Sequence, residues 1–272
     1  MVLSEAGSEA VGASGNGSAG QGGGELPAVV LLHSGVADSR MWEPQVRALE
    51  KRFRVLAPDL RGFGDRPHEP GPFSHADDVL ALLDAEGVER AAVVGSSFGG
   101  RVALDVATTA PDRVSALVLL CAAAPGLPRT DDVRAFGEEE DRLLEAGDLD
   151  AAVELNVRTW LGPEASPQAR ELVRKMQARA FALDAAAEAL VPQPEPIPVD
   201  IDPAALGMPA LVVGGGHDLE WFQQTARHLA GSMSRAELVI LDWAGHLPSL
   251  ERPDEVSGLL REFLEQELRP AR

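Results

Sequence analysis

Short runs of apolar residues alternate with longer amphipathic segments along most of the chain. The first of these runs, residues 28–33, is apolar at nearly every position, and the later runs share this property. Strands that are apolar on both faces are typical of a parallel sheet covered by helices on both sides. The pattern predicts strands at residues 28–33, 53–57, 91–94, 114–120, 210–213 and 237–241.

Amphipathic segments with apolar residues at helical spacing separate these strands. A last helix begins at Pro253, with Asp254 and Glu255 in its first turn, where proline and acidic side chains are favourable. The alternation of strands and helices predicts an α/β fold, with a mostly parallel sheet and helices on both of its faces. The other predicted helices of this core lie at residues 41–51, 76–86, 102–109 and 221–230.

The alternation stops between residues 125 and 201. Four prolines then occupy alternate positions from Pro192 to Pro198, which predicts a stiff, extended connector. We therefore expect residues 125–205 to form a helical cap, inserted between the two parts of one core, residues 25–124 and 206–272. The helical patterns of this cap lie at residues 131–146, 150–160 and 168–190.

The beginning of the chain has a different composition. Residues 8–24 are nearly all Gly, Ser, Ala, Asn and Gln, so we expect residues 1–24 to be a flexible N-terminal segment with little to bury. The triplet Gly15, Gly17 and Gly20 matches the spacing of a dinucleotide-binding fingerprint, but no strand pattern precedes it. We therefore do not interpret this triplet as a nucleotide site.

The charge of the chain narrows its partners. The chain of 272 residues carries 43 acidic and 24 basic residues, for a net charge of −19. Such a surface repels phosphate backbones and anionic lipid headgroups, so we expect a small-molecule substrate and neither nucleic acid nor membrane as a partner. The sequence leaves the oligomeric state open.

The sequence also lacks the usual marks of metal binding and secretion. Its one cysteine, Cys121, has no partner for an internal disulfide, and no Cys/His cluster has zinc spacing, so we expect no metal and no cofactor. No run approaches the length of about 20 apolar residues that spans a membrane. The first residues lack the basic and apolar regions of a signal peptide, and a cytoplasmic location is expected.

The sequence Gly95-Ser96-Ser97-Phe98-Gly99 lies between a predicted strand and a predicted helix. This Gly-x-Ser-x-Gly pattern occurs once in the chain and is typical of a sharp turn that exposes the hydroxyl of its central serine. Only Ser97 has glycines at both required positions, whereas Ser96 is out of register. On its own the pattern also fits an ordinary glycine-rich turn. Other residues of the chain are needed to distinguish a nucleophile from such a turn.

A serine nucleophile needs a base, and the base needs an acceptor that fixes its tautomer. Asp218 follows the strand predicted at residues 210–213, and His246 follows the strand at residues 237–241. The carboxyl ends of parallel strands meet at one edge of a sheet, so Ser97, Asp218 and His246 are predicted to form a catalytic triad. Glu220 and Asp242 are weaker candidates for the acid, because Asp242 lies close to its strand and Glu220 lies further along its loop.

The chain resembles α/β-hydrolase fold enzymes over essentially its whole length from Leu26. This resemblance implies an oxyanion hole formed by the backbone N–H groups of Phe98 and Gly35. The loop reads His-Ser-Gly where the family commonly has His-Gly-x, so the second donor is Gly35 or Val36. Within the superfamily, residues 39–42 resemble those of 3-oxoadipate enol-lactonases and related C–C bond hydrolases. The segments that carry the wider resemblance are Leu31–Gly35, Ala57–Gly64, Val94–Gly100 and Gly245–Pro253.

These features predict a serine hydrolase that cleaves an ester, a lactone or a similar carbonyl compound through an acyl-enzyme. A C–C bond hydrolase and a cofactor-free haloperoxidase or perhydrolase use the same triad and stay as alternatives, as does a non-catalytic ligand sensor. Epoxide hydrolases and haloalkane dehalogenases of this fold use a carboxylate nucleophile. The serine at position 97 therefore excludes both of these classes. Trp42 and Trp160 are expected to contact the substrate.

Overall fold

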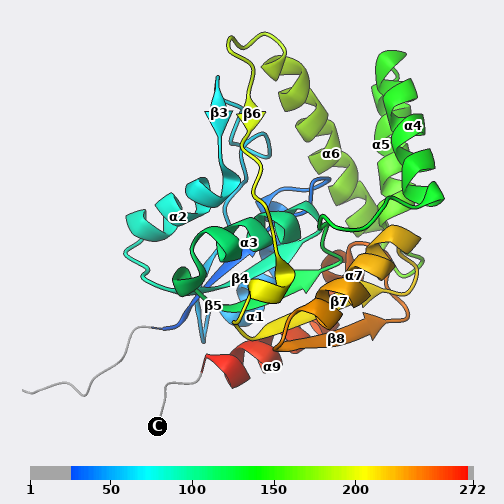
Figure 1. Cartoon of the computed structure of the whole chain (residues 1–272). Coiled ribbons are helices and arrows are strands. Elements are labelled where there is room, and N and C mark those ends of the chain that lie inside the picture. The colour runs from blue at the N-terminus through cyan, green and yellow to red at the C-terminus, as the bar shows by residue number, and fades with distance from the viewer. Residues whose placement is uncertain (1–25, 269–272) are drawn as a thin grey trace, which may run out of the picture.

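The computed structural model describes residues 26–268, and its centre is a parallel sheet (Figure 1). Within these residues the main sheet has six strands in the order β2-β1-β4-β5-β7-β8, and every neighbouring pair is parallel. The predicted fold class is therefore confirmed. The strands are β1 (Ala28–Leu32), β2 (Arg54–Leu56), β4 (Ala91–Ser96), β5 (Val114–Leu120), β7 (Ala210–Gly215) and β8 (Ala236–Leu241).

Both faces of the sheet are buried, as the continuous apolar runs predicted. In β1, Val29 and Leu31 belong to one apolar cluster, whereas Val30 and Leu32 belong to the cluster on the opposite face. Burying one such side chain stabilises the fold by about 1.5–3 kcal/mol. Apolar residues are therefore favoured on both faces of the central strands. Helices α1 (Glu43–Leu49) and α9 (Pro253–Glu267) cover the first face, and α2 (His75–Ala85), α3 (Phe98–Thr109) and α7 (Glu220–Ser232) pack on the second.

Three long helices lie between β5 and β7 in the chain, where the sequence predicted a helical cap. We call α4 (Asp131–Glu145), α5 (Leu149–Trp160) and α6 (Pro167–Ala187) the inserted helices. Helix α5 packs against both α4 and α6, and all three rise from the same side of the sheet (Figure 1). Local side chains set the starts of two of them, since Asp148 accepts a hydrogen bond from Ala151 N and Ser166 accepts one from Ala169 N.

Several short elements were not predicted from the sequence. Strands β3 (Pro72–Phe73) and β6 (Glu195–Pro196) form a separate parallel pair, and a two-residue strand is too short to show any periodicity. The helix predicted over residues 41–51 is split into a 3-10 turn, η1 (Ser39–Trp42), and α1. The remaining short elements are η2 (Pro111–Arg113), η3 (Pro203–Ala205) and α8 (Pro248–Glu251).

The order of the strands decides where a site is able to form. The chain leaves β1 toward β2 and returns to β4 on the other side of β1, so the loops that follow β1 and β4 diverge. In open parallel sheets a crevice at such a point is the usual place of ligand binding. Loops from β1, β4, β7 and β8 reach this edge.

Two further observations concern the ends and the surface of the fold. The flexible segment expected at residues 1–24 lies outside the described residues. Among residues 26–268, no helix combines the length and the apolar character that crossing a bilayer requires.

Candidate active site

Ser97 lies at the turn between β4 and α3, in a backbone conformation that residues other than glycine rarely adopt. Its φ is 52° and its ψ is −112°, and such strain costs about 1–3 kcal/mol. The glycines on either side are required by space, because a Cβ on Gly95 would lie 2.2 Å from Gly99 O and a Cβ on Gly99 would lie 2.2 Å from Leu32 O. The turn is held to β5 by a hydrogen bond of 2.9 Å from Ser97 N to Leu120 O.

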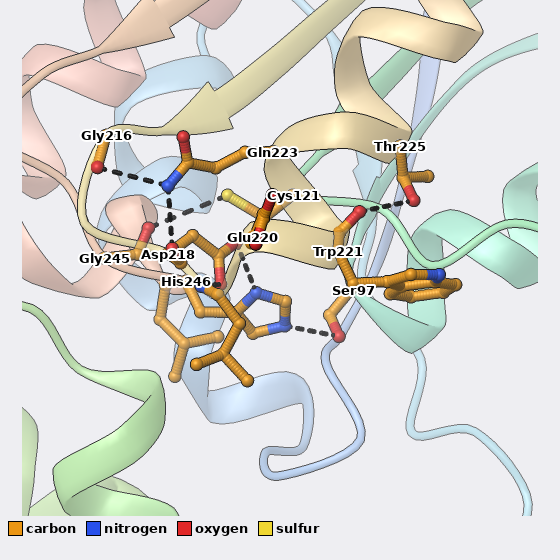
Figure 2. Close-up of polar contacts among 12 residues, drawn as sticks. Ser97, Cys121, Gly216, Asp218, Glu220, Trp221, Gln223, Thr225, Gly245 and His246 are labelled. Carbon is orange, nitrogen blue, oxygen red and sulfur yellow. Dashed lines mark hydrogen bonds and ion pairs between the residues drawn. The ribbon is translucent and has the colours of Figure 1, made fainter. Parts of the chain in front are cut away.

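Ser97, His246 and Asp218 form one chain of hydrogen bonds (Figure 2). The Ser97 Oγ atom lies 2.7 Å from His246 Nε2, and His246 Nδ1 lies 2.7 Å from Asp218 Oδ2. A carboxylate only accepts, so Nδ1 carries the proton and Nε2 is left to accept the hydroxyl proton. All three side chains are largely buried, and the serine retains 9% exposure toward a cavity.

The loop after β7 presents Asp218 rather than the two other acids considered from the sequence. Leu219 N donates to Asp218 Oδ1 at 2.7 Å, and the Gln223 amide donates to Asp218 O at 2.8 Å, so both the side chain and the backbone of Asp218 are fixed (Figure 2). Glu220 accepts a hydrogen bond from Gln224 on the surface of α7, and Asp242 is exposed. Neither of these carboxylates pairs with His246.

The loop that carries His246 is anchored by a buried acid that the sequence analysis did not single out. Glu251, in the short helix α8, accepts hydrogen bonds from Gly245 N at 3.0 Å and from Leu247 N at 3.3 Å. Burial raises the pKa of this carboxyl above its ordinary value. From the opposite side, His246 N donates to Trp160 O, at the end of α5, over 3.1 Å. The sequence around Glu251 mixes apolar and polar residues, so no pattern there marked this acid.

The N–H groups expected to form an oxyanion hole lie together beside Ser97. Phe98 is the first residue of α3, so its N–H has no partner within the helix. A Cβ on Gly35 would lie 3.4 Å from Phe98 Cβ, which places the two loops in contact. Among the described residues no acceptor faces the N–H groups of Phe98, Gly35 or Val36. Gly35 and Val36 both line the cavity, so both are suitable second donors.

His33 holds the loop after β1 in place. Its Nδ1 lies 2.9 Å from Ser34 O, and its Nε2 accepts a hydrogen bond of 2.9 Å from Leu60 N. Complete burial lowers the pKa of His33, so the ring stays neutral and keeps both bonds. This side chain therefore joins the loops after β1 and β2.

A cavity of about 300 Å³ opens above the serine, between the core and the inserted helices. Trp160 lines it, and the Trp160 ring centroid lies 4.6 Å from that of His246. The structure does not bring Trp42 to this cavity, although the sequence analysis expected substrate contact there. Trp42 is fully buried in the core, because the 3-10 turn η1 directs it inward beneath the loop. The residues that line the cavity are Ser34, Gly35, Val36, Ser97, Phe136, Glu140, Asn156, Trp160, Gln177, Phe181, Asp184, Phe222 and His246.

A larger hollow of about 880 Å³ lies at the opposite edge of the sheet, where the strands begin. It is lined by residues such as Pro27, Phe53 and Arg90, and it contains no serine, cysteine or histidine. Size alone therefore does not identify the reactive site. The smaller cavity is lined by both the predicted nucleophile, Ser97, and the predicted base, His246.

Cys121 lies behind the triad and offers a test of metal binding. Its sulfur and the ligand atoms of Asp218 and His246 lie within 4.8 Å of one another. Burial raises the pKa of the Cys121 thiol well above its ordinary value, whereas a metal binds the thiolate. Asp218 and His246 are already hydrogen-bonded to each other. The three side chains therefore fit a hydrogen-bonded network better than a metal site.

The fold, the strained serine turn and the hydrogen-bonded side chains at the edge of the sheet define a hydrolase. The chain belongs to the alpha/beta hydrolase family, whose sequence model matches residues 29–259. The family resemblance seen in the sequence motifs is thereby confirmed. A putative carbamate hydrolase, RutD, of Agrobacterium fabrum is 30% identical over 262 residues, which cover 86% of this chain and 92% of that protein.

Solved structures give the same result. An esterase from Thermogutta terrifontis is similar with a TM-score of 0.72 at 28% identity, over 89% of this chain and 91% of that chain. An enol-lactonase from Burkholderia xenovorans LB400 is similar with a TM-score of 0.71 at 30% identity, over 90% of this chain and 94% of that chain. The similar proteins thus include hydrolases with different named activities.

Proposed function

We propose that this chain is a serine hydrolase that cleaves a small ester, lactone or similar carbonyl compound, with Ser97 as nucleophile. The observation that carries the proposal is the continuous hydrogen-bonded chain from Ser97 through His246 to Asp218, with 2.7 Å at each step. Its position beside a cavity, in a member of a hydrolase family, supports the same proposal.

The first half of the reaction forms an acyl-enzyme. His246 Nε2 takes the proton of the Ser97 hydroxyl as the oxygen attacks the carbonyl carbon, and the carbonyl electron pair moves onto its oxygen. The N–H groups of Phe98 and of Gly35 or Val36 stabilise this oxyanion. The tetrahedral intermediate collapses, the bond to the leaving group breaks, and the imidazolium returns its proton to that group.

The second half reverses these roles with water. His246 takes a proton from a water molecule that attacks the acyl carbon, and the bond to Ser97 Oγ breaks as that oxygen regains its proton. Asp218 keeps the imidazole in one tautomer and stabilises the charge that it carries in both halves. The sum is hydrolysis, with the protein unchanged.

Replacement of the nucleophile tests this assignment. Ser97→Ala is expected to lower the kcat/KM for 4-nitrophenyl acetate by about 10³-fold or more, because the residual rate comes from binding and the oxyanion hole alone. The matched control is Ser96→Ala, because Ser96 is also buried and its hydroxyl has no hydrogen-bond partner among residues 26–268. The control is expected to retain activity and to react with a fluorophosphonate, which Ser97→Ala does not.

Two results would contradict the proposal. Equal activity of Ser97→Ala and the wild-type protein would exclude Ser97 as nucleophile. Labelling of Ser97 without turnover of any ester, lactone or vinylogous diketone would favour a ligand sensor on the same fold. Turnover of the diketones or of peracids in place of esters would favour a C–C bond hydrolase or a perhydrolase with the same triad.

We further propose that residues 125–205 act as a cap over the core formed by residues 25–124 and 206–272. The inserted helices supply Phe136, Trp160, Gln177 and other residues to the cavity wall, which supports a role in substrate selection. The cytoplasmic location and the absence of nucleic-acid and membrane partners stay predictions from the sequence.

A further inference from the structure

The wall that the inserted helices contribute to the cavity is polar as well as aromatic. Helix α4 supplies Glu140, α5 supplies Asn156, and α6 supplies Gln177 and Asp184. Two of these are carboxylates, and none of the described residues that line the cavity is a lysine or an arginine. The fixed charge of the wall is therefore negative.

Asn156 holds Glu140 in one position, and both hydrogens of its amide group are used. Its amide nitrogen donates to Glu140 Oε1 and to Ala152 O, and its oxygen accepts a hydrogen bond of 2.8 Å from Trp160 Nε1. Within residues 26–268 the second oxygen of Glu140 receives no hydrogen bond. Burial raises the pKa of the Glu140 carboxyl above its ordinary value. Glu140 thus presents an acceptor that the protein itself leaves unused.

Gln177 presents a second unused acceptor to the same cavity. Its side chain is 96% buried, and its Oε1 atom has no hydrogen-bond partner in the described part of the chain. Buried polar atoms are nearly always paired, so an unpaired one on a residue that lines a cavity indicates a group supplied by a ligand. The rings of Phe136, Trp160 and Phe181 line the same cavity, and such apolar surroundings strengthen a hydrogen bond that is made there.

Asp184 is set apart from this pair. It is mostly exposed, and its Oδ1 lies 2.9 Å from His68 Nε2, so its bonding is satisfied at the surface. Glu140 and Gln177 are the two members of the wall that each keep one side-chain oxygen without a hydrogen bond within residues 26–268. We call these two side chains the acceptor subsite.

We propose that the acceptor subsite binds a hydrogen-bond donor on the substrate, such as a hydroxyl, an amide N–H or an ammonium group, and selects against substrates that carry a carboxylate. This inference rests on the proposed function, because it concerns the substrate of the same serine. It narrows the substrate from any small ester or lactone to a neutral or cationic compound with a donor group.

A series of 4-nitrophenyl esters of six-carbon acids tests the subsite. The acyl chains end in a methyl, a hydroxyl, an ammonium or a carboxylate group, and the release of 4-nitrophenolate gives kcat/KM. A hydrogen bond to a charged group changes binding by about tenfold to a hundredfold, so the hydroxyl and ammonium esters are expected to exceed the carboxylate ester by about that factor. Assays in 0.5 M salt remove the long-range effect of the net charge of −19 and leave the local one.

Charge removal at Glu140 gives the sharpest comparison. Glu140→Gln keeps the size of the side chain and an acceptor for Asn156, and it is expected to lower the ratio of ammonium to carboxylate turnover by about tenfold or more. Glu138→Gln is the matched control, because Glu138 is an exposed acid of the same helix. Gln177→Leu is expected to lower the ratio of hydroxyl to methyl turnover by about tenfold, and if this variant fails to fold the Glu140 comparison decides.

The outcomes separate this inference from the proposed function. Ester turnover that depends on Ser97, with equal rates for all four chain ends or equal effects of Glu140→Gln and Glu138→Gln, overturns the acceptor subsite and leaves the hydrolase in place. If no ester is hydrolysed, the proposed function fails. The subsite is then tested by calorimetric binding of the four corresponding primary amides to Ser97→Ala protein. The hydroxyl and ammonium amides are expected to bind more tightly than the carboxylate amide, and equal affinities overturn the subsite.

Discussion

The turn at Ser97 depends on both its backbone conformation and the close packing around it. The positive φ of Ser97 turns the hydroxyl toward His246, and the close approach of backbone segments leaves no room for a side chain at Gly95 or Gly99. The nucleophile turn is therefore specified by glycines as much as by the serine. That is why the Gly-x-Ser-x-Gly pattern was readable in the sequence, whereas residues that act through packing alone were not.

Substitution of a turn glycine is expected to show this directly. In Gly99→Ala the new methyl group meets the backbone oxygen of Leu32, and overpacking of this kind costs about 1–3 kcal/mol of folding free energy. Activity is expected to fall as well, because the turn has to shift. Urea unfolding and ester turnover measure the two effects.

Gly258→Ala is the control for that experiment. Gly258 lies within α9 with no heavy atom close to the position of an added Cβ, and alanine stabilises a helix interior by up to about 1 kcal/mol relative to glycine. Stability is expected to rise and activity to be retained. A loss of stability in Gly258→Ala equal to that in Gly99→Ala would contradict the packing argument.

His75 makes the stability of the fold depend on pH. Burial lowers the pKa of His75 from 6.5 to about 4, and the ring packs edge-on against Phe73 and Phe98. Because the unfolded chain binds this proton more readily than the folded one, the stabilisation is complete above pH 6.5 and is lost as the pH falls from 6.5 toward 4. The full shift corresponds to at most about 3 kcal/mol.

The contribution of His75 is measured as a difference between two proteins, since carboxylates titrate in the same range. Urea unfolding of the wild-type protein and of His75→Phe at pH 7.5 and pH 4.5 gives the two free energies of unfolding. The variant is expected to lose less stability on acidification than the wild-type protein. Equal losses would show that the imidazole does not titrate differently in the folded and unfolded states.

At the scale of secondary structure, short helix α8 does more for the site than its length suggests. The Glu251 carboxylate accepts hydrogen bonds from the backbone N–H groups on either side of His246. The N–H group of His246 itself donates to the end of α5. The candidate base, His246, is thus held between a core element and an inserted helix. Gly162 completes this junction, because a Cβ there would meet Gly245 N and Glu251.

Removal of Glu251 is expected to cost stability and activity together. Glu251→Ala leaves Gly245 N–H and Leu247 N–H buried without acceptors, at about 1–3 kcal/mol each. Glu251→Gln retains one acceptor and is expected to recover part of the loss. Urea unfolding gives the stability, and a fall in kcat that exceeds the change in KM would mark an effect on the position of His246.

The control is Glu262→Ala on the exposed face of α9, which is expected to change neither quantity measurably. A comparable loss in that variant would assign the effect to net charge. Full activity of a folded Glu251→Ala protein would show that the loop keeps His246 in place by itself.

The elements differ in how well their sequence predicted them. The strands of the main sheet were found within a few residues, because burial on both faces leaves a continuous apolar run. The pair β3 and β6 was missed, because each strand has only two residues, one of them a proline, and is too short to show a hydrophobic period. Helix α8 was missed for the same reason, and the helix predicted from Met41 was divided because η1 begins its own turn.

At the scale of the whole molecule, the candidate triad was predictable because it depends on topology. Ser97, Asp218 and His246 are far apart in the chain, but each follows a strand of one parallel sheet, and parallel strands end at one edge. The burial of Trp42 and the role of Glu251 depend on how helices pack across that edge. No local pattern records such packing, so these features required the structure.

The hydrogen bond between Trp160 O and His246 N has a consequence for protein engineering. Specificity is often redesigned by transplanting an entire insert from one relative into another. In this chain such a chimera would replace the segment whose backbone carbonyl group holds the candidate base, His246, and a shift of that carbonyl group would lower turnover for reasons unrelated to the new substrate. A graft limited to α6 leaves that carbonyl group native while replacing Gln177, and is the safer design.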